Sequence, residues 1–185
     1  MDDDDVQALG WVPLDGRGSL PFALVHGESL VAAASWAVGE ADIQLVDASV
    51  TFAQVRESGR PLLLHDPLCP LAPVDHLVAA LELCVSTGQV VAGFRPVTDT
   101  VKHADGDLLG GTVDRAGLRT VTTPVVLPAA VLADLDGVDT SDLAVLVASL
   151  AQRGPVAWIE SPALAGRIVD EPSLRVLEAL SRSQV

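Results

Sequence analysis

Residues 62–67 read Leu-Leu-Leu-His-Asp-Pro, and this stretch decides how the chain is expected to fold. A short apolar run bounded by turn residues is typical of a strand buried in a parallel sheet. In open α/β sheets, ligands bind outside the carboxyl ends of the strands. We therefore expect His65 and Asp66 at such an edge, where Asp66 is a candidate to hold a metal or to orient a substrate hydroxyl. A turn or helix-capping carboxylate is the simpler alternative.

Apolar runs and helical stretches alternate on both sides of this segment. Such alternation predicts an α/β fold with a mostly parallel sheet and helices on both faces. Residues 97–121 break the pattern, because Thr- and Val-rich halves flank a turn signal at 105–107, and they predict a β-arm that leaves the sheet. The predicted strands are 9–14, 42–46, 61–64, 89–94, 155–159 and 167–169, and the predicted helices are 28–38, 50–57, 75–86, 128–135, 141–152 and 172–180.

Length and composition narrow the class of protein. The 185 residues suit one domain, which we place at 9–185 after an acidic, disordered start at 1–8. A net charge of −14 and an aromatic content of 3% argue against a nucleic-acid partner. The chain has no apolar run of the roughly 18 residues that a membrane helix needs, and its start lacks a secretory signal. Cys69 and Cys84 lack CxxC spacing, which favours reduced thiols in the cytoplasm.

A glycine-containing loop follows the first predicted strand. It reads Leu14-Asp15-Gly16-Arg17-Gly18, and its Gly-x-Gly turn lets backbone N–H groups approach an anion. The loop is neither a Walker loop nor a full GxGxxG motif, so a plain tight turn is the alternative. We take Leu14, Asp15, Gly16 and Gly18 as candidate nucleotide-binding residues.

Three further motifs carry polar side chains suited to a phosphate ligand. They are Pro-Val-Thr-Asp-Thr-Val-Lys at 96–102, Thr-Val-Asp-Arg at 112–115 and Thr-Pro at 123–124. Lys102 and Arg115 are fixed cations that suit phosphate oxygens, although an exposed hairpin also carries such charges without any ligand. The Thr123 hydroxyl is suited to a ligand, or the residue simply ends a strand.

These motifs, together with His-Asp-Pro-Leu-Cys-Pro-Leu at 65–71, resemble those of the 2-C-methyl-D-erythritol 4-phosphate cytidylyltransferase family. The family pattern is HDAARPL, PVxDTxK, TVDRxxL and TPQ, in this order and at similar spacing. The tail, with Ile-Glu at 159–160 and Gly-Arg-Ile-Val at 166–169, is similar to the family's closing strand. The resemblance implies a Rossmann-like nucleotidyltransferase with three α/β/α layers, and a cytoplasmic homodimer whose β-arms interlock.

The resemblance also implies an activity and a set of site residues. CTP and Mg²⁺ would be used to transfer a cytidylyl group to a sugar-alcohol phosphate in non-mevalonate isoprenoid synthesis. Asp66 would face the acceptor hydroxyls and hold the metal, and Arg167 would replace the Lys that meets the substrate phosphate. The remaining implied substrate-binding residues are Thr100 and Arg115 from the partner's arm, Lys102 and Thr123.

Several departures from the family pattern affect the CTP half of this predicted site. Leu20 and Phe22 stand where the family has the Arg and Lys that grip the triphosphate, and Asp15 adds a negative charge. Removing one preorganised donor costs roughly 2.7–4 kcal/mol of transition-state stabilisation. Arg17 lies inside the loop and is our candidate to supply charge there, so we group it with Asp66 as a catalytic candidate.

The cytosine-contacting segment is not recognisable between residues 47 and 60, nor is the acidic, Ser-containing stretch before the last strands. Cys69 and Val125 replace an Arg and a Gln of the family pattern. The sequence therefore predicts a diverged, shortened homologue whose transfer activity is weakened or lost. A changed acceptor, such as a pentitol phosphate, and a non-catalytic dimer with a binding or scaffold role remain the alternatives.

Overall fold

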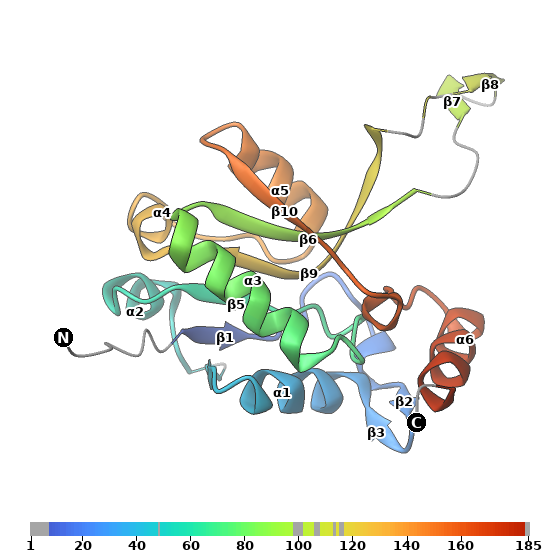
Figure 1. The fold of residues 1–185 in the computed structure, drawn as a ribbon, viewed down its shortest axis with the longest axis horizontal. Coiled ribbons are helices and arrows are strands. Elements are labelled where there is room, and N and C mark those ends of the chain that lie inside the picture. Colours follow the sequence, from blue (N-terminus) through green and yellow to red (C-terminus); the bar gives the residue numbers. More distant parts are fainter. Residues whose placement is uncertain are drawn as a thin grey trace.

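The fold is built on a six-stranded sheet with the strand order β10-β6-β9-β5-β1-β4 (Figure 1). A computed structural model describes residues 8–47, 49–97, 102–105, 108–112, 114 and 117–183. Strand β9 is antiparallel to both of its neighbours, and the other pairings are parallel, so the sheet is mostly parallel as predicted. The strands are β1 (Leu9–Trp11), β4 (Gln44–Leu45), β5 (Leu62–Leu64), β6 (Val90–Pro96), β9 (Arg119–Leu127) and β10 (Val156–Glu160).

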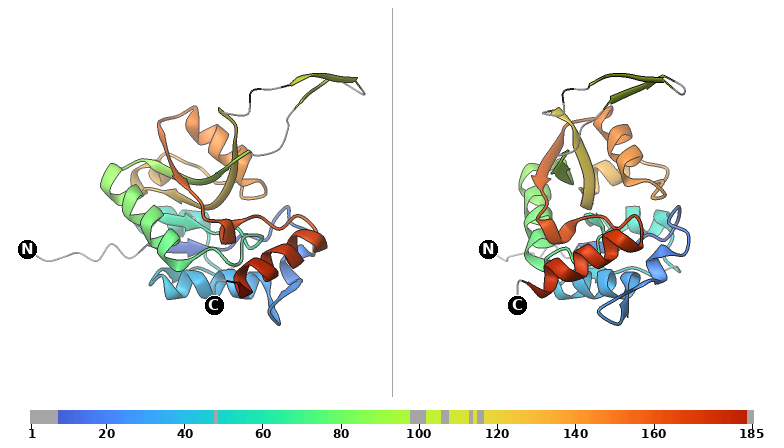
Figure 2. Two further views of the ribbon diagram at one scale, coloured as in Figure 1. Left: turned by 45° about the vertical axis from the view of Figure 1, so that its right-hand side comes forward. Right: turned by 90° about the vertical axis from the view of Figure 1, so that its right-hand side faces the viewer.

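Helices cover both faces of the sheet, which confirms the predicted α/β class. Helices α1 (Leu30–Glu40) and α3 (Val74–Thr87) pack on one face. The other face is covered by α2 (Phe52–Glu57), α4 (Ala129–Ala133) and α5 (Leu143–Ala151). In the right-hand view of Figure 2, α3 (green) and α5 (orange) lie on opposite sides of the sheet.

A smaller apolar cluster joins the end of the chain to its beginning. Helix α6 (Glu171–Arg182) buries Leu174 and Leu177 against Val25 and Leu30. Val25 belongs to a short hairpin of β2 (Leu24–Val25) and β3 (Glu28–Ser29). The 3-10 turns η1 (Leu20–Phe22) and η3 (Ala163–Ala165) lie in the loops that lead into β2 and α6.

Local sequence explains where the main elements begin and end. The three leucines of β5 are fully buried, as the apolar run predicts. Helix α3 starts after Pro73 and stops at Gly88, which adopts a φ of 66° that favours glycine. Helix α5 is capped by Asp142, whose side chain accepts hydrogen bonds from the Ala144 and Val145 N–H groups.

The region around the predicted arm differs from the prediction. Strands β7 (Lys102–Asp105) and β8 (Leu108–Thr112) form an antiparallel hairpin that lies away from the sheet in Figure 1. Residues 119–121, however, belong to β9, which sequence analysis did not predict as a strand. The first half of β9, Arg-Thr-Val-Thr-Thr, is mostly polar, and only the second half is continuously apolar. The strand therefore lacks the long apolar run by which a buried strand is predicted.

Strand β9 also pairs irregularly with β6. The pairs Ala92–Val125 and Phe94–Val121 enclose one residue on β6, Gly93, but three on β9, so β9 carries two extra residues in a bulge. The bulge contains Thr122 and Thr123. Bulges of this kind re-aim side chains next to functional sites.

The predicted strand at 167–169 is wrong, because these residues form irregular chain. Ile168 is buried, and its N–H donates to the Leu68 carbonyl over 2.7 Å. The backbone hydrogen bond of Ile168 is therefore made to a loop and not to a neighbouring strand. Of the start predicted to be disordered at 1–8, residues 1–7 lie outside the described residues, whereas Ala8 is buried in the core, so the prediction is wrong for this residue. Within the described part of the chain, no helix is long and apolar enough to cross a membrane.

Candidate functional site

Chain topology brings the glycine loop, the His65-Asp66 turn and Thr123 to one edge of the sheet. Strands β1, β5, β6 and β10 all end at this edge, and β9 begins there because it runs the opposite way. A cavity of about 360 Å³ lies at this edge. It is lined by Gly16, Asp66, Arg119, Thr120, Val121, Thr122, Ser141, Asp142, Leu143, Ala144 and Arg167.

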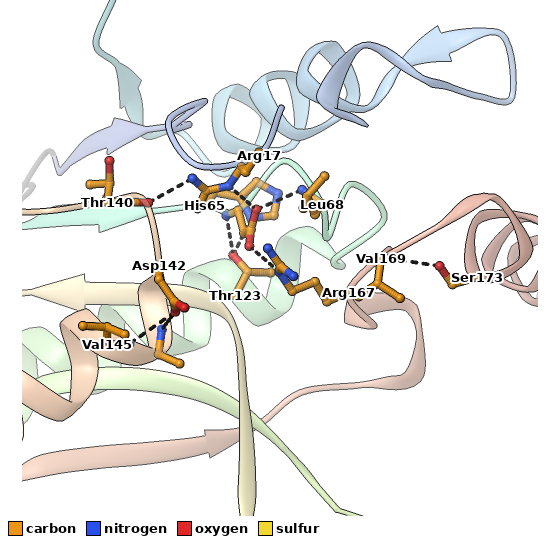
Figure 3. A network of polar contacts seen from close by, with 12 residues as sticks. Arg17, His65, Leu68, Thr123, Thr140, Asp142, Val145, Arg167, Val169 and Ser173 are labelled. Carbon is orange, nitrogen blue, oxygen red and sulfur yellow. Dashed lines mark hydrogen bonds and ion pairs between the residues drawn. The ribbon is translucent and has the colours of Figure 1, made fainter. Parts of the chain in front are cut away.

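Arg17 closes the glycine loop over Asp66. Its Nε donates to Asp66 Oδ1 over 2.7 Å, and its Nη1 donates to the Thr140 carbonyl over 2.9 Å (Figure 3). Nη1 also donates to the Asp15 carbonyl over 2.5 Å. The Arg17 side chain is almost fully buried. Gly16, with a φ of 74°, lies so close to Ser141 that a Cβ would stand 2.5 Å from its carbonyl oxygen. The loop is therefore folded against residues 139–142.

Arg167 holds the second oxygen of the same carboxylate. Its Nε donates to Asp66 Oδ2 over 3.0 Å, and the Leu68 N–H donates to Oδ1 over 3.0 Å. Burial pushes the pKa of Asp66 up, but the Arg17 charge and the hydrogen bonds from Arg17, Leu68 and Arg167 outweigh it, so the pKa lies below its ordinary value. Asp66 is thus an anion held between two guanidinium groups.

This arrangement does not fit a protein-bound Mg²⁺ ion. Divalent cations such as Mg²⁺ take oxygen ligands, usually from one or two carboxylates. Both Asp66 oxygens are already engaged in ion pairs. Among the described residues, no three His, Cys, Asp or Glu side chains gather in a group that could hold a metal. Asp66 therefore acts in this structure as an anchor for two arginines.

A buried polar network lies directly behind Asp66. Thr123 Oγ1 lies 2.6 Å from His65 Nδ1 and accepts a hydrogen bond from the Asp66 N–H over 3.3 Å. His76 Nε2 lies 3.1 Å from the Thr123 carbonyl oxygen and 3.0 Å from Ser161 Oγ. Thr123 is fully buried, so its hydroxyl fixes the His65-Asp66 turn, while its neighbour Thr122 lines the cavity.

We expect the stability of the fold to fall between pH 6.5 and 4 because of His65. Burial lowers the pKa of His65 from 6.5 to about 4. The unfolded chain therefore binds a proton in this range that the native state does not, and the free energy of unfolding decreases as the pH falls, by about 3 kcal/mol. Burial also lowers the pKa of His76, which acts in the same direction.

Urea unfolding at a series of pH values measures this effect. In the variant His65→Gln, which removes the titrating ring, the slope of stability against pH should shrink over this range. His26→Gln is the matched control, because His26 is exposed. An equally steep slope in His65→Gln would show that other groups cause the loss.

The structure brings together part of the predicted site. Asp66, Arg17 and Arg167 meet directly, and Thr123 lies one contact behind them. Of the loop residues, Gly16 lines the cavity, whereas Leu14, Asp15 and Gly18 are exposed. Thr100 and Arg115 lie outside the described residues, and Lys102 is described only as part of strand β7.

Sequence analysis missed two contributions to the cavity. The first is the acidic, Ser-containing segment 139–142, whose Thr140 carbonyl accepts from Arg17 and whose Asp142 caps α5. A Ser-Asp pair before an apolar helix is a recognisable N-terminal signal, so this segment could have been found. The second is Arg119, which stands at the start of the unpredicted strand β9.

A family model and two curated proteins that are similar to this chain point to the same family. Residues 39–153, more than half of the chain, match the family model described as IspD: 2-C-methyl-D-erythritol 4-phosphate cytidylyltransferase. A bifunctional enzyme IspD/IspF of Clavibacter michiganensis subsp. michiganensis is 38% identical over 64% of this chain and 30% of its own length. A 2-C-methyl-D-erythritol 4-phosphate cytidylyltransferase of Deinococcus radiodurans is 29% identical over 65% of this chain and 53% of its own length.

The fold is likewise shared with a solved structure. The crystal structure of 2-C-methyl-D-erythritol 4-phosphate cytidylyltransferase from Thermus thermophilus superposes with a TM-score of 0.69 and 24% identity. The superposition covers 95% of this chain and 98% of that one. The curated relatives are matched over a smaller share: the two sequence alignments span 30% and 53% of their lengths.

Proposed function

Because this chain belongs to the 2-C-methyl-D-erythritol 4-phosphate cytidylyltransferase family, we propose that it transfers a cytidylyl group from CTP to a sugar-alcohol phosphate at a reduced rate. The observation that carries this proposal is the cavity at the sheet edge, where Asp66 and Arg167 meet the glycine loop. Membership rests on the match over residues 39–153.

The proposed reaction is an in-line displacement at phosphorus. A phosphate oxygen of the acceptor attacks the α-phosphorus of CTP, the bond from this phosphorus to the bridging β-phosphate oxygen breaks, and pyrophosphate leaves. Such a reaction needs mainly positioning and charge stabilisation from the protein. Arg167 supports this role, because it is partly exposed beside the cavity while Asp66 fixes its Nε.

A reduced rate is proposed because the first loop offers little positive charge to a triphosphate. Leu20 and Phe22 occupy the 3-10 turn η1, and Phe22 is 60% exposed. Arg17 commits its Nε and Nη1 to Asp66 and to two carbonyl groups. Among the described residues no three His, Cys, Asp or Glu side chains form a metal-binding group, and in this proposal Mg²⁺ is held mainly by the phosphates of CTP.

A homodimer forms the second part of the proposal. In it, the β7–β8 hairpin of one subunit would reach the site of the other and supply Thr100 and Arg115. The support is the position of this hairpin away from its own sheet (Figure 1). Sedimentation of the purified protein tests the dimer, and a monomer at all concentrations would contradict it.

Release of pyrophosphate from CTP, Mg²⁺ and 2-C-methyl-D-erythritol 4-phosphate tests the proposed activity. We expect slow release that requires all three components. No release above background at high enzyme concentration would refute it. The alternative is a non-catalytic homologue with a binding or scaffold role, favoured by the same lack of charge at Leu20 and Phe22. That alternative predicts no calorimetric binding of CTP at millimolar concentration.

Restoring the two cations should increase the activity. We expect the double variant Leu20→Arg, Phe22→Lys to raise kcat/KM on the order of 100-fold, the effect of one preorganised donor. Phe22 is exposed, and Leu20 is partly buried against the apolar cluster of α6, where the aliphatic stem of an arginine can keep the contact. The matched control is Val176→Arg, Leu180→Lys, which adds the same charges to exposed positions of α6. An equal gain in the control would show that net charge alone is responsible.

A further inference from the structure

Arg119 has an unusual environment at the mouth of the cavity. Its guanidinium carbon lies 4.8 Å from the ring centroid of Phe94 and 4.9 Å from that of Trp158. The two rings themselves pack edge to face, with centroids 6.0 Å apart and planes at 89°. Stacking of this type uses the face of the guanidinium group and leaves the N–H donors in its plane available.

Pairing of the strands explains why these three side chains meet. Phe94 on β6 pairs with Val121 on β9, and Arg119 lies two residues before Val121 and thus on the same face. On the other side, Phe94 pairs with Glu160 of β10, and Trp158 lies two residues before Glu160. The aromatic pair is therefore a fixed platform built from two neighbouring strands, and Arg119 is held on it.

Within the described part of the chain, no carboxylate forms an ion pair with Arg119, whose guanidinium group stacks on the two rings. Asp66, which lines the same cavity, is paired with Arg17 and Arg167. Asp142 also lines the cavity; its Oδ1 accepts from two N–H groups at the start of α5, and it forms no ion pair with Arg119 in the described structure. Although the chain has a net charge of −14, this cavity is lined by Arg119 and Arg167, and both keep N–H donors that no carboxylate engages in the described structure.

We infer that Arg119, together with Arg167, binds the phosphate group of a phosphomonoester, and that this recognition requires no divalent cation. Two guanidinium groups match the geometry and charge of a dianionic phosphate. A cavity of about 360 Å³ suits a small polyol phosphate. The inference rests on the proposed function only for the identity of the phosphate ester as the acceptor. Arg119 would then be a specificity residue that none of the predicted motifs contains.

Calorimetric titration with D-erythritol 4-phosphate in the presence of EDTA tests the inference without requiring turnover. The wild-type protein should bind this probe and should bind unphosphorylated erythritol far more weakly. Arg119→Met, which keeps an apolar chain on the rings but removes the donors, should raise the Kd about 10- to 100-fold. Arg119→Lys keeps the charge without the planar fork and should give an intermediate Kd.

The control variant is Arg175→Met, which removes an exposed arginine of α6 that pairs only with Glu171 in the described structure. It should leave the Kd unchanged. A wild-type protein that does not distinguish the phosphate ester from erythritol, or an Arg119→Met Kd within threefold of wild type, would overturn the inference. If Arg119→Met weakened binding of CTP instead, the phosphate at Arg119 would belong to the nucleotide and our assignment would be wrong.

These outcomes are separable from those of the activity assay. A protein that releases pyrophosphate but binds the phosphate ester equally well without Arg119 keeps the proposed function and loses this inference. A protein that binds the ester through Arg119 but releases no pyrophosphate keeps this inference and loses the proposed function.

Discussion

Replacement of Asp66 by Asn is expected to destabilise the fold by about 3–5 kcal/mol, because it leaves a buried cation without its partner. The Arg17 side chain is 1% exposed and donates directly to Asp66 Oδ1. A neutral amide can accept one hydrogen bond but cannot compensate the guanidinium charge. Arg167 is less affected, since its side chain is 37% exposed and water can solvate it. Urea denaturation with linear extrapolation measures the loss.

Two further variants separate this explanation from a general effect of losing a carboxylate. Glu171→Gln breaks the exposed pair with Arg175 and should cause no measurable change, since exposed ion pairs contribute little. The double variant Arg17→Met, Asp66→Leu removes both buried charges together and should recover much of the stability. Equal instability in the double variant would show that packing, and not the unpaired charge, governs the loss.

Replacement of Gly93 by Ala is expected to cost about 3 kcal/mol, because strand β6 has no room for a side chain at this position. An added Cβ would lie 2.3 Å from the Thr123 carbonyl oxygen, 2.7 Å from its carbon and 2.9 Å from Ser161 Oγ. The two nearest atoms are backbone of the central strand β9, so relief requires a shift of the sheet itself. Thermal and urea unfolding both report the change.

Gly39→Ala is the natural control for this substitution. Gly39 lies within helix α1, and an added Cβ there would meet no atom within 4 Å. Alanine in a helix interior is favoured over glycine, so we expect stabilisation by up to about 1 kcal/mol. A Gly93→Ala protein as stable as wild type would contradict the close approach of β6 and β9.

The parts of the fold that depend on local pattern were predictable from the sequence. The apolar run before His65 and the capping signals of helix α3 each placed their element correctly to within two residues. Strand β9 was missed because half of it is polar and its partners are distant in sequence. The prediction of a strand at 167–169 was wrong for a similar reason. The Ile168 N–H donates to the carbonyl of Leu68 in a distant loop, and a single sequence does not reveal this contact.

The candidate site likewise contains one part that local sequence predicts and one part that depends on long-range contacts. The position of Asp66 after β5 follows from the motif itself. The direction of Arg17 does not, because its partners are 49 and 123 residues away along the chain. The same holds for Arg119, whose environment depends on the alignment of three strands. Long-range pairing decides which charges are engaged and which remain for a ligand, and a single sequence does not contain that information.

The irregular pairing of β9 with β6 has a consequence for how such a domain can change. Because the surplus on β9 is two residues, an even number, the side chains before and after it keep their inward and outward alternation. Excision of two residues at this point would keep Val121 and Val125 on the faces of the sheet that they occupy now. A deletion that includes Thr123 would remove the hydroxyl group that tethers the His65-Asp66 turn. A deletion in this bulge would therefore change the support behind Asp66 without changing which side chains of β9 face inward and outward.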